Sequence, residues 1–392
     1  MAVTYRLYKP EDINQVVDLL QGIFRVAPGF NVDAWQRLES HDHMTIVAVE
    51  ENKIVGAIPF DLRDFLLRPG LSIRAAFAHL VGVHAQHRDR RIGSGIMDYA
   101  KKLLPQHCEA MFVYTGHEYR PPYTFYARNG FVDLQYSRFY KRKKLILNYP
   151  QVVDVQPFDP LAIGEEVLNS VYQKVYNDHA GFRVHYPGYW QKALKSIIFV
   201  EIPTEMYIAM VRIGSELAGY AIFGFVRGHV TILEMAADPA DLDLNKKLLQ
   251  AVIAKAHELG AEYADMLASA HHPAKTALHN MRFKPEPRLH AQIPAGFVLN
   301  FQRLWTKLTD EKAPFSLKIW TPNVSMDLPG AGKKITLEMK EYTLHRLFLC
   351  REDFKEAYEA ERTTSPDAHL PVKELTQIFK PARWIYHWLE WI

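Results

Sequence analysis

Residues 81–97 have the sequence VGVHAQHRDRRIGSGIM, in which an apolar segment leads through a basic, glycine-containing turn into a helical pattern. The apolar run 75–83 before the turn predicts a strand covered on both faces, and apolar residues return at helical spacing over 96–104. Glycine lets backbone N–H groups approach a ligand closely, and the start of a helix adds unpaired donors and positive partial charge. This segment therefore predicts a binding site for a polyphosphate anion.

The spacing of the glycines excludes two common phosphate-binding motifs. No Gly-Lys-Ser/Thr follows the turn, as a Walker loop requires, and the G-x-G-x-x-G spacing of dinucleotide-binding domains does not occur. What remains is Arg90-Arg91-Ile92-Gly93-Ser94-Gly95, which resembles the R/Q-x-x-G-x-G/A signature of the GNAT (Gcn5-related) N-acetyltransferases. The alternative is a strand–turn–helix whose glycines only make the turn and whose arginines are solvated.

The resemblance implies a site for acetyl-CoA. In this family the loop holds the pyrophosphate, and the strands splay, here after Val83, so that free backbone N–H groups hold the pantetheine arm and polarise the acetyl carbonyl. The residues implied as cofactor-binding are Leu80, Val81, Val83, Arg88, Arg90, Arg91, Ile92, Gly93, Ser94 and Gly95.

A second motif follows at the expected distance. Phe125-Tyr126-Ala127-Arg128-Asn129-Gly130-Phe131 resembles the family's F-Y-x-x-x-G-F segment, and Gly130 predicts the end of a helix before the next strand. The resemblance implies that Tyr126 is catalytic and protonates the departing thiolate. The alternative is that Tyr126 only packs its ring in the core.

Composition limits the class of protein. The 392 residues are 48% hydrophobic and 23% charged with a formal net charge of +3, which is typical of a soluble globular protein of two or three domains. The charge balance argues against nucleic acid as a partner. Cys108 and Cys350 form no C-x-x-C pattern, and the histidines show no zinc-ligand spacing, so we expect no metal. Without a signal core or a membrane-spanning run, we expect a cytoplasmic protein.

The order of elements predicts an internal repeat. Strand, helix, hairpin and strand lead into the arginine–glycine loop, and the same order returns after Pro150. In the second copy the loop is Asp238-Pro-Ala-Asp-Leu-Asp-Leu-Asn245, whose carboxylates would repel a pyrophosphate, and Leu278-His-Asn-Met-Arg-Phe283 replaces the tyrosine segment. We therefore expect a second copy without activity.

Tandem copies with only the first competent resemble the enhanced-intracellular-survival (Eis) family of acetyltransferases. The resemblance implies three domains: a catalytic GNAT domain over 1–147, a degenerate GNAT-like domain over 148–292, and a sterol-carrier-protein-like α+β domain over 293–392. Residues 301–305, 315–320, 324–328 and 334–339 are expected as strands of that third domain and 342–348 and 353–361 as helices. The resemblance also implies a homo-oligomer such as a hexamer.

The chain ends in an aromatic segment, 384–392. The family resemblance implies that the terminal carboxylate of Ile392 acts near Tyr126. Glu118 and Glu390 of this chain are competing candidates for the base. The alternative is that these aromatic residues only pack the end of the chain onto the body.

The sequence thus predicts a mixed α+β protein that moves an acetyl group from acetyl-CoA directly to a primary amine of a polyamine, an aminoglycoside or a lysine-bearing peptide. Two alternatives from other classes are a CoA-binding sensor without turnover and a lipid or sterol carrier that uses the last domain.

Overall fold

The computed structural model describes residues 2–24, 42–116, 121–146, 153–195, 202–367 and 369–391. These residues form two compact units. Unit 1 holds the described residues of 1–23, 39–134 and 293–383, and unit 2 holds those of 24–38, 135–292 and 384–392. Both units combine helices with sheets, which confirms the mixed α+β class. The two units do not coincide with the three expected domains, so the boundaries at 147 and 292 stay a prediction.

Unit 1 is built on a sheet with the strand order β1-β2-β3-β4-β6-β17. Its strands are β1 (Thr4–Leu7), β2 (His43–Glu50), β3 (Lys53–Arg68), β4 (Leu71–Ala78), β5 (Gly82–Val83), β6 (Ala110–Gly116), β7 (Val132–Asp133) and β17 (Gln292–Val298). Its first helices are α1 (Ile13–Ile23), α3 (Ile92–Leu103) and α4 (Pro121–Arg128), and a short 3-10 turn η2 covers Ala85–His87. The strands β4 and β6 run parallel, while β1 to β4 pair antiparallel with their neighbours. The predicted order of elements in the first copy is confirmed.

Helix α3 packs its apolar stripe on the sheet. Ile96 and Met97 are fully buried together with Ile58 and Phe60 of β3. A Cβ at Gly56 of β3 would lie 3.1 Å from Ile96 Cδ1, so a glycine at this position permits the close approach of helix and strand. This packing fixes the start of α3 beside the end of the sheet.

The rest of unit 1 contains a smaller sheet with the order β19-β18-β20-β21 and four helices. Its elements are α10 (Phe301–Leu308), β18 (Ser316–Trp320), β19 (Ser325–Leu328), β20 (Lys334–Met339), α11 (Glu341–Phe348), α12 (Phe354–Glu359), β21 (Thr363–Thr364) and α13 (Val372–Ile378). The strand predicted over 301–305 was wrong, because Asn300 caps a helix there and Leu304, Trp305 and Leu308 are buried along one helical face. The other expected strands and helices of this segment are confirmed.

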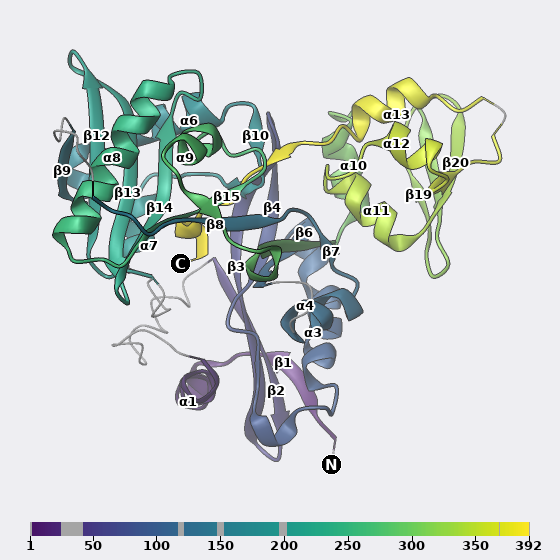
Figure 1. Cartoon of the computed structure of the whole chain (residues 1–392). Helices are drawn as coiled ribbons and strands as arrows, with labels where there is room; N and C mark the ends of the chain where they lie inside the picture. Colours follow the sequence, from purple (N-terminus) through teal and green to yellow (C-terminus); the bar gives the residue numbers. More distant parts are fainter. Residues whose placement is uncertain are drawn as a thin grey trace. The chain divides into compact units, whose positions relative to one another are not determined.

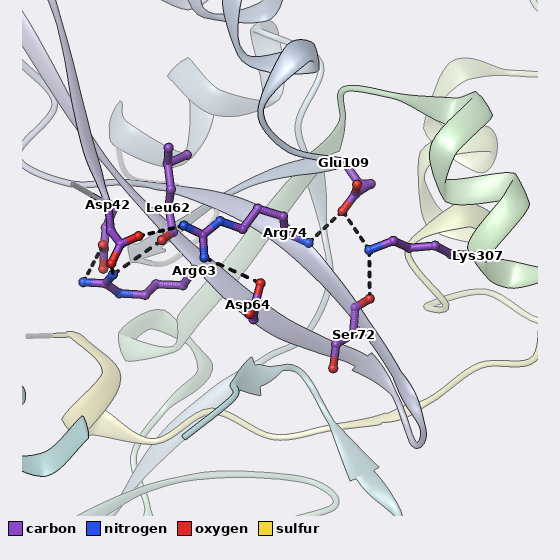
Figure 2. Close-up of polar contacts among 9 residues, drawn as sticks. Asp42, Leu62, Arg63, Asp64, Ser72, Arg74, Glu109 and Lys307 are labelled. Carbon is purple, nitrogen blue, oxygen red and sulfur yellow. Dashed lines mark hydrogen bonds and ion pairs between the residues drawn. The ribbon is translucent and has the colours of Figure 1, made fainter. Parts of the chain in front are cut away.

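A buried carboxylate joins α10 to the large sheet of unit 1. Glu109, which is 5% exposed, accepts a hydrogen bond from the backbone N–H of Arg74 at 2.7 Å and one from Lys307 Nζ at 3.3 Å. Lys307 Nζ also donates to the backbone oxygen of Ser72 at 3.2 Å. Figure 2 shows Glu109 and Lys307 between the strand that carries Ser72 and Arg74 and the neighbouring helix. A buried charge of this kind holds the two elements together because it would be costly to leave unpaired.

Unit 2 repeats the architecture of the first copy. Its sheet has the order β8-β15-β14-β13-β12-β9, and β14 and β15 run parallel, as β4 and β6 do. Its strands are β8 (Ser137–Arg142), β9 (Asp154–Pro157), β10 (His179–Ala180), β11 (Phe182–Arg183), β12 (Met206–Ile213), β13 (Glu216–Val226), β14 (His229–Ala237), β15 (Ala264–Ser269) and β16 (Lys284–Pro285). Its helices are α5 (Pro160–Ile163), α6 (Glu165–Tyr176), α7 (Tyr189–Lys195), α8 (Leu242–Glu258) and α9 (Lys275–Asn280). Figure 1 shows α8 lying across β12, β13 and β14, as expected for the helix after the central strand.

The strand expected after Gly130 is split into two parts in the structure. Its first part is β7, which pairs with β17, and its second part is β8, which pairs along its whole length with β15. The end of the first copy therefore contributes its last strand to unit 2.

Candidate functional site

A cavity of about 810 Å³ lies in unit 1 beside the first turn of α3 and helix α4. It is lined by Ile23, Val81, Val83, His87, Arg88, Asp89, Arg91, Ile92, Gly93, Ser94, Pro121, Pro122, Thr124, Phe125, Tyr126, Arg128 and Asn129. The two sequence motifs thus meet in one cavity. Of the residues predicted to bind the cofactor, Leu80, Arg90 and Gly95 are not among those that line it.

The central strand breaks beside this cavity, which Val81 and Val83 line. Pairing between β4 and β6 stops at Ala78 and Val113, and the chain then pairs only with β3 through β5. The strands therefore separate after Ala78, and the prediction that they splay after Val83 was five residues too late. Within the described part of the chain, the backbone N–H groups of Leu80 and Val81 donate to no backbone oxygen. These donors are available to a ligand at the break.

The first turn of α3 provides further unpaired donors. The first backbone bond of this turn runs from Gly95 N to Arg91 O at 2.9 Å, which leaves the N–H groups of Ile92, Gly93 and Ser94 without an intrahelical acceptor. Arg91 precedes the helix and provides no side-chain cap. An anion in the cavity would meet these donors and the positive end of the helix dipole.

The left-handed residue of the turn is an arginine. Arg91 has φ +59°, a backbone conformation that favours glycine. If the R/Q-x-x-G-x-G/A signature is placed two residues earlier, Arg88 takes its first position, Arg91 stands for the first glycine and Gly93 for the second. The backbone geometry favours this second register over the one that begins at Arg90.

Three guanidinium groups, those of Arg88, Arg91 and Arg128, line the cavity against one carboxylate, that of Asp89. This excess of positive charge suits a polyphosphate.

Arg90 has a different role. Its guanidinium donates to Glu50 Oε2 at 2.8 Å and Oε1 at 2.6 Å, and this pairing lowers the pKa of Glu50 to about 2. His87 Nδ1 lies 3.0 Å from the same carboxylate. Arg90 thus ties the 85–91 turn to the end of β2 instead of lining the cavity.

The two glycines of the motif make room for aromatic side chains. A Cβ at Gly93 would lie 3.0 Å from Phe125 Cε2, and one at Gly95 would lie 2.1 Å from the hydroxyl of Tyr5. Gly95 is therefore required by the Tyr5 side chain, and only Gly93 faces the cavity.

Tyr126 lies in α4 and is 6% exposed. Its ring makes edge contacts with Phe125 and Phe131 at centroid distances of 5.1 and 5.5 Å. Burial raises its pKa further above the ordinary value of 10, so the phenol keeps its proton at neutral pH. Among the described residues its hydroxyl has no hydrogen-bond partner, while the side chain lines the cavity. This phenol is placed to donate a proton to a ligand.

Helix α4 ends where the sequence predicted. Gly130 has φ +81°, and Phe131 N donates to Tyr126 O at 3.1 Å in a Schellman turn. The same turn closes α9 of the second copy, where Arg282 has φ +60° and Phe283 N donates to Leu278 O at 2.9 Å. Leu278 is therefore the structural counterpart of Tyr126.

In the second copy, unlike the first, a side chain caps the N-terminus of the helix. Asp241 precedes α8, as Arg91 precedes α3, but its side chain accepts a hydrogen bond from Leu244 N at 2.9 Å. Asp243 is the second residue of α8, as Gly93 is of α3. A capped first turn that carries a carboxylate offers little to an anion.

The predicted catalytic carboxylate of Ile392 lies outside the described residues, as does Glu118, and the structure describes no side chain for Glu390. The preceding segment belongs to unit 2. Ile385 N donates to Ala180 O at 2.8 Å. The side chains of Trp384, Trp388 and Leu389 are buried, so the segment packs on the body of the protein, and the role of the terminal carboxylate stays a prediction.

Sequence reasoning missed Phe125, Arg128 and Asn129 as cavity residues. All three lie within the F-Y-x-x-x-G-F segment, so a test of that whole segment, and not of Tyr126 alone, would have found them.

Known proteins share the domain type and the fold of this chain. Residues 4–132 match the family model described as an acetyltransferase (GNAT) domain. A probable N-acyltransferase from Enterococcus faecalis, a conserved protein of unknown function, has the same fold with a TM-score of 0.70 at 15% identity over 99% of both chains. A GCN5-related N-acetyltransferase from Anabaena variabilis gives a TM-score of 0.70 at 13% identity over 98% of this chain and 99% of that one.

Eis1 from Mycobacterium abscessus gives a TM-score of 0.57 at 12% identity over 97% of this chain and 98% of that one. No curated protein matches the sequence significantly. Because these structural matches are so low in identity, they establish the fold alone. Within the described residues, no helix has the length and apolar character to cross a membrane.

Proposed function

We propose that the chain moves an acetyl group from acetyl-CoA directly to a primary amine, and the premise is the match of residues 4–132 to the family model of a GNAT acetyltransferase domain. The observation that carries the proposal is the meeting of the uncapped first turn of α3 with the protonated Tyr126 in one cavity. The amine belongs to a polyamine, an aminoglycoside or a lysine-bearing peptide.

Several groups of unit 1 suit acetyl-CoA. The N–H groups of residues 92–94 and the side chains of Arg88 and Arg91 would hold the pyrophosphate. The free N–H groups of Leu80 and Val81, at the break between β4 and β6, would hold the pantetheine arm and polarise the acetyl carbonyl. Acetyl-CoA would supply the activated acetyl thioester.

The chain's own residues then manage protons. The neutral amine nitrogen forms a bond to the carbonyl carbon, the bond from carbon to sulfur breaks, and Tyr126 gives its proton to the departing thiolate. An ammonium group must first lose one proton to a base to give this neutral amine, and we propose the carboxylate of Ile392 for this role by family resemblance. After the new bond forms, the nitrogen releases a second proton, which balances the proton that Tyr126 gave to the thiolate. A free alkyl amine with a pKa near 10.4 needs such a base at neutral pH.

Direct transfer is favoured because neither cysteine suits an acyl carrier. Cys108 and Cys350 are fully buried, and burial raises the pKa of each thiol to about 12. A thiol in that environment is a poor nucleophile at neutral pH. The ternary complex of protein, donor and amine is therefore the proposed reacting state.

The lipid-carrier alternative has less support. A cavity of about 610 Å³ lies beside α10, but Thr306, Glu311 and Lys312 are among its lining residues. A lipid tail favours an apolar lining, so this cavity does not compete with the transferase hypothesis.

The cofactor site can be tested by calorimetry with acetyl-CoA. We predict one binding site per chain and loss of binding in Gly93→Asp, because the added carboxylate lies where the pyrophosphate is held. Gly93→Ala controls for the crowding of Phe125, and Asp243→Ala, at the matching position of the second copy, should leave affinity unchanged. Two sites per chain, or loss of binding in Asp243→Ala, would contradict the assignment to unit 1.

A further inference from the structure

Asn129 directly follows α4 and contacts α3. It lines the cavity, and it is 7% exposed. Its side-chain Nδ2 donates to the backbone oxygen of Phe125 at 2.8 Å and approaches Ser94 Oγ at 3.4 Å. Its backbone oxygen accepts a hydrogen bond from Lys101 Nζ at 2.7 Å. Because Ser94 is in the first turn of α3 and Lys101 in the last, this one residue holds the end of α4 to both ends of α3.

The hydrogen bond from Lys101 involves a charged group that is partly shielded from solvent. The ammonium group lies 4.6 Å from the centre of the Phe297 ring, and burial lowers the pKa of Lys101. A cation at the last carbonyl groups of a helix also complements the helix dipole. This contact fixes where the backbone of α4 ends.

Comparison with the second copy shows which of the contacts of Asn129 is shared by both copies. Met281 follows α9 as Asn129 follows α4, and its backbone oxygen also accepts a hydrogen bond from a cation, Arg142 Nη1. The cation–carbonyl contact is thus common to both copies. The side-chain amide of Asn129 reaches Ser94 in the first turn of α3, whereas Met281 of the second copy has no amide. Only the first copy also has a tyrosine three residues earlier, at Tyr126.

We propose that Asn129 is a positioning residue for acetyl transfer, whose side-chain amide fixes Tyr126 relative to the first turn of α3. This inference rests on the function proposed above. The donor is held by the α3 turn and the acid is carried by α4, so the distance between thiolate and phenol depends on the junction of the two helices. A shift of this junction would slow proton donation without weakening the cradle for the pyrophosphate.

The test compares Asn129→Met, which installs the residue of the second copy, with Met281→Leu as the matched control. We expect kcat to fall about tenfold or more in Asn129→Met, while the Kd for acetyl-CoA stays within about twofold and the melting temperature is nearly unchanged. Ser94→Ala removes the other end of the contact and should lower kcat less. In a Tyr126→Phe background, Asn129→Met should cost little more, because the group it positions is already lost.

The outcomes are distinct. A folded Asn129→Met protein with unchanged kcat would overturn the inference, as would an increased Kd with unchanged kcat, which would make Asn129 a binding residue. If Asn129→Met fails to fold, Ser94→Ala decides, and unchanged kcat in that variant refutes the role. A wild-type protein that releases no CoA with any amine would instead refute the proposed function itself.

Discussion

Two arginines of the 85–91 turn have different surroundings although they are only two positions apart. Arg88 lines the cavity, whereas Arg90 is held by both oxygens of Glu50. We predict that Arg88→Ala raises the Kd for acetyl-CoA by roughly threefold to tenfold at low salt, and less at high salt, because a solvated charge acts through screened attraction. The Kd measured as a function of ionic strength tests this.

Arg90→Ala should act through the shape of the turn. Its effect on the Kd should depend little on salt, and Glu50→Gln should reproduce it, since each change breaks the same pair. Equal salt dependence in the Arg88 and Arg90 variants would contradict this division of roles.

At the residue scale, the sequence indicated the loop but not its register. Glycine at 93 and 95 suggested that the motif begins at Arg90, yet the left-handed backbone is at Arg91 and Gly95 faces Tyr5. An arginine can adopt this conformation at a cost of about 1–2 kcal/mol, so composition alone does not locate it. Which glycine faces a ligand depends on packing between residues far apart in the chain.

At the element scale, a buried glutamate of β14 gives a pH-dependent stability. Glu234 is fully buried, with Tyr220 and Trp190 donating to its Oε1 at 2.6 and 3.2 Å, and burial raises its pKa from 4.5 to about 7. Since the folded value is above the unfolded one, its contribution to stability is complete below pH 4.5 and is lost as the pH rises through about 7.

We predict that Glu234→Gln, which keeps the shape but not the charge, gains stability relative to the wild type between pH 5 and 8, on the order of 2 kcal/mol. Melting temperatures of both proteins across this range provide the measurement. Asp265, whose pKa burial also raises to about 7, is present in both proteins and cancels. Parallel pH profiles would show that Glu234 does not titrate in this range.

The ends of helices were the most predictable elements. Gly130 has a positive φ and closes a Schellman turn, as its place in the F-Y-x-x-x-G-F segment indicated, and Gly260 closes α8 in the same way. The helix over 301–308 was missed because its apolar residues were assigned to a strand, although Asn300 before it is a typical cap. Short apolar runs fit either period, and tertiary packing decides between them.

At the scale of the whole molecule, the end of the chain is anchored on unit 2, with Ser269 Oγ donating to Trp384 O at 3.3 Å. We predict that deletion of Trp391 and Ile392, or a short C-terminal tag, lowers the rate of acetyl transfer, because either change moves or removes the terminal carboxylate. The chain should stay folded in both variants. Turnover and the melting temperature of both variants test this, with an N-terminal tag as the control. Full activity of the C-terminally tagged protein would return Glu118 or Glu390 as candidate bases.

The tandem arrangement was predictable from the order of elements, but the grouping into units was not. The sequence suggested three successive domains, which stay a prediction, and it did not indicate that residues 293–383 lie in the same compact unit as the first copy. Contacts such as Glu109 with Lys307 join residues almost two hundred positions apart, and no local pattern predicts them. Conversely, the expectation that the second copy lacks the site came from local residues, because Asp243 and Leu278 occupy the positions that match Gly93 and Tyr126.

The most direct test of acetyl transfer at this cavity is the release of CoA by Tyr126→Phe compared with the wild type, measured against a panel of polyamines, aminoglycosides and lysine-bearing peptides. The substitution keeps the buried ring and removes only the proton donor. We predict amine-dependent release by the wild type, a fall in kcat of about a hundredfold or more in the variant, and an unchanged Kd for acetyl-CoA. Full activity in Tyr126→Phe would contradict the acid assignment, and no amine-dependent release by the wild type would contradict acetyl transfer.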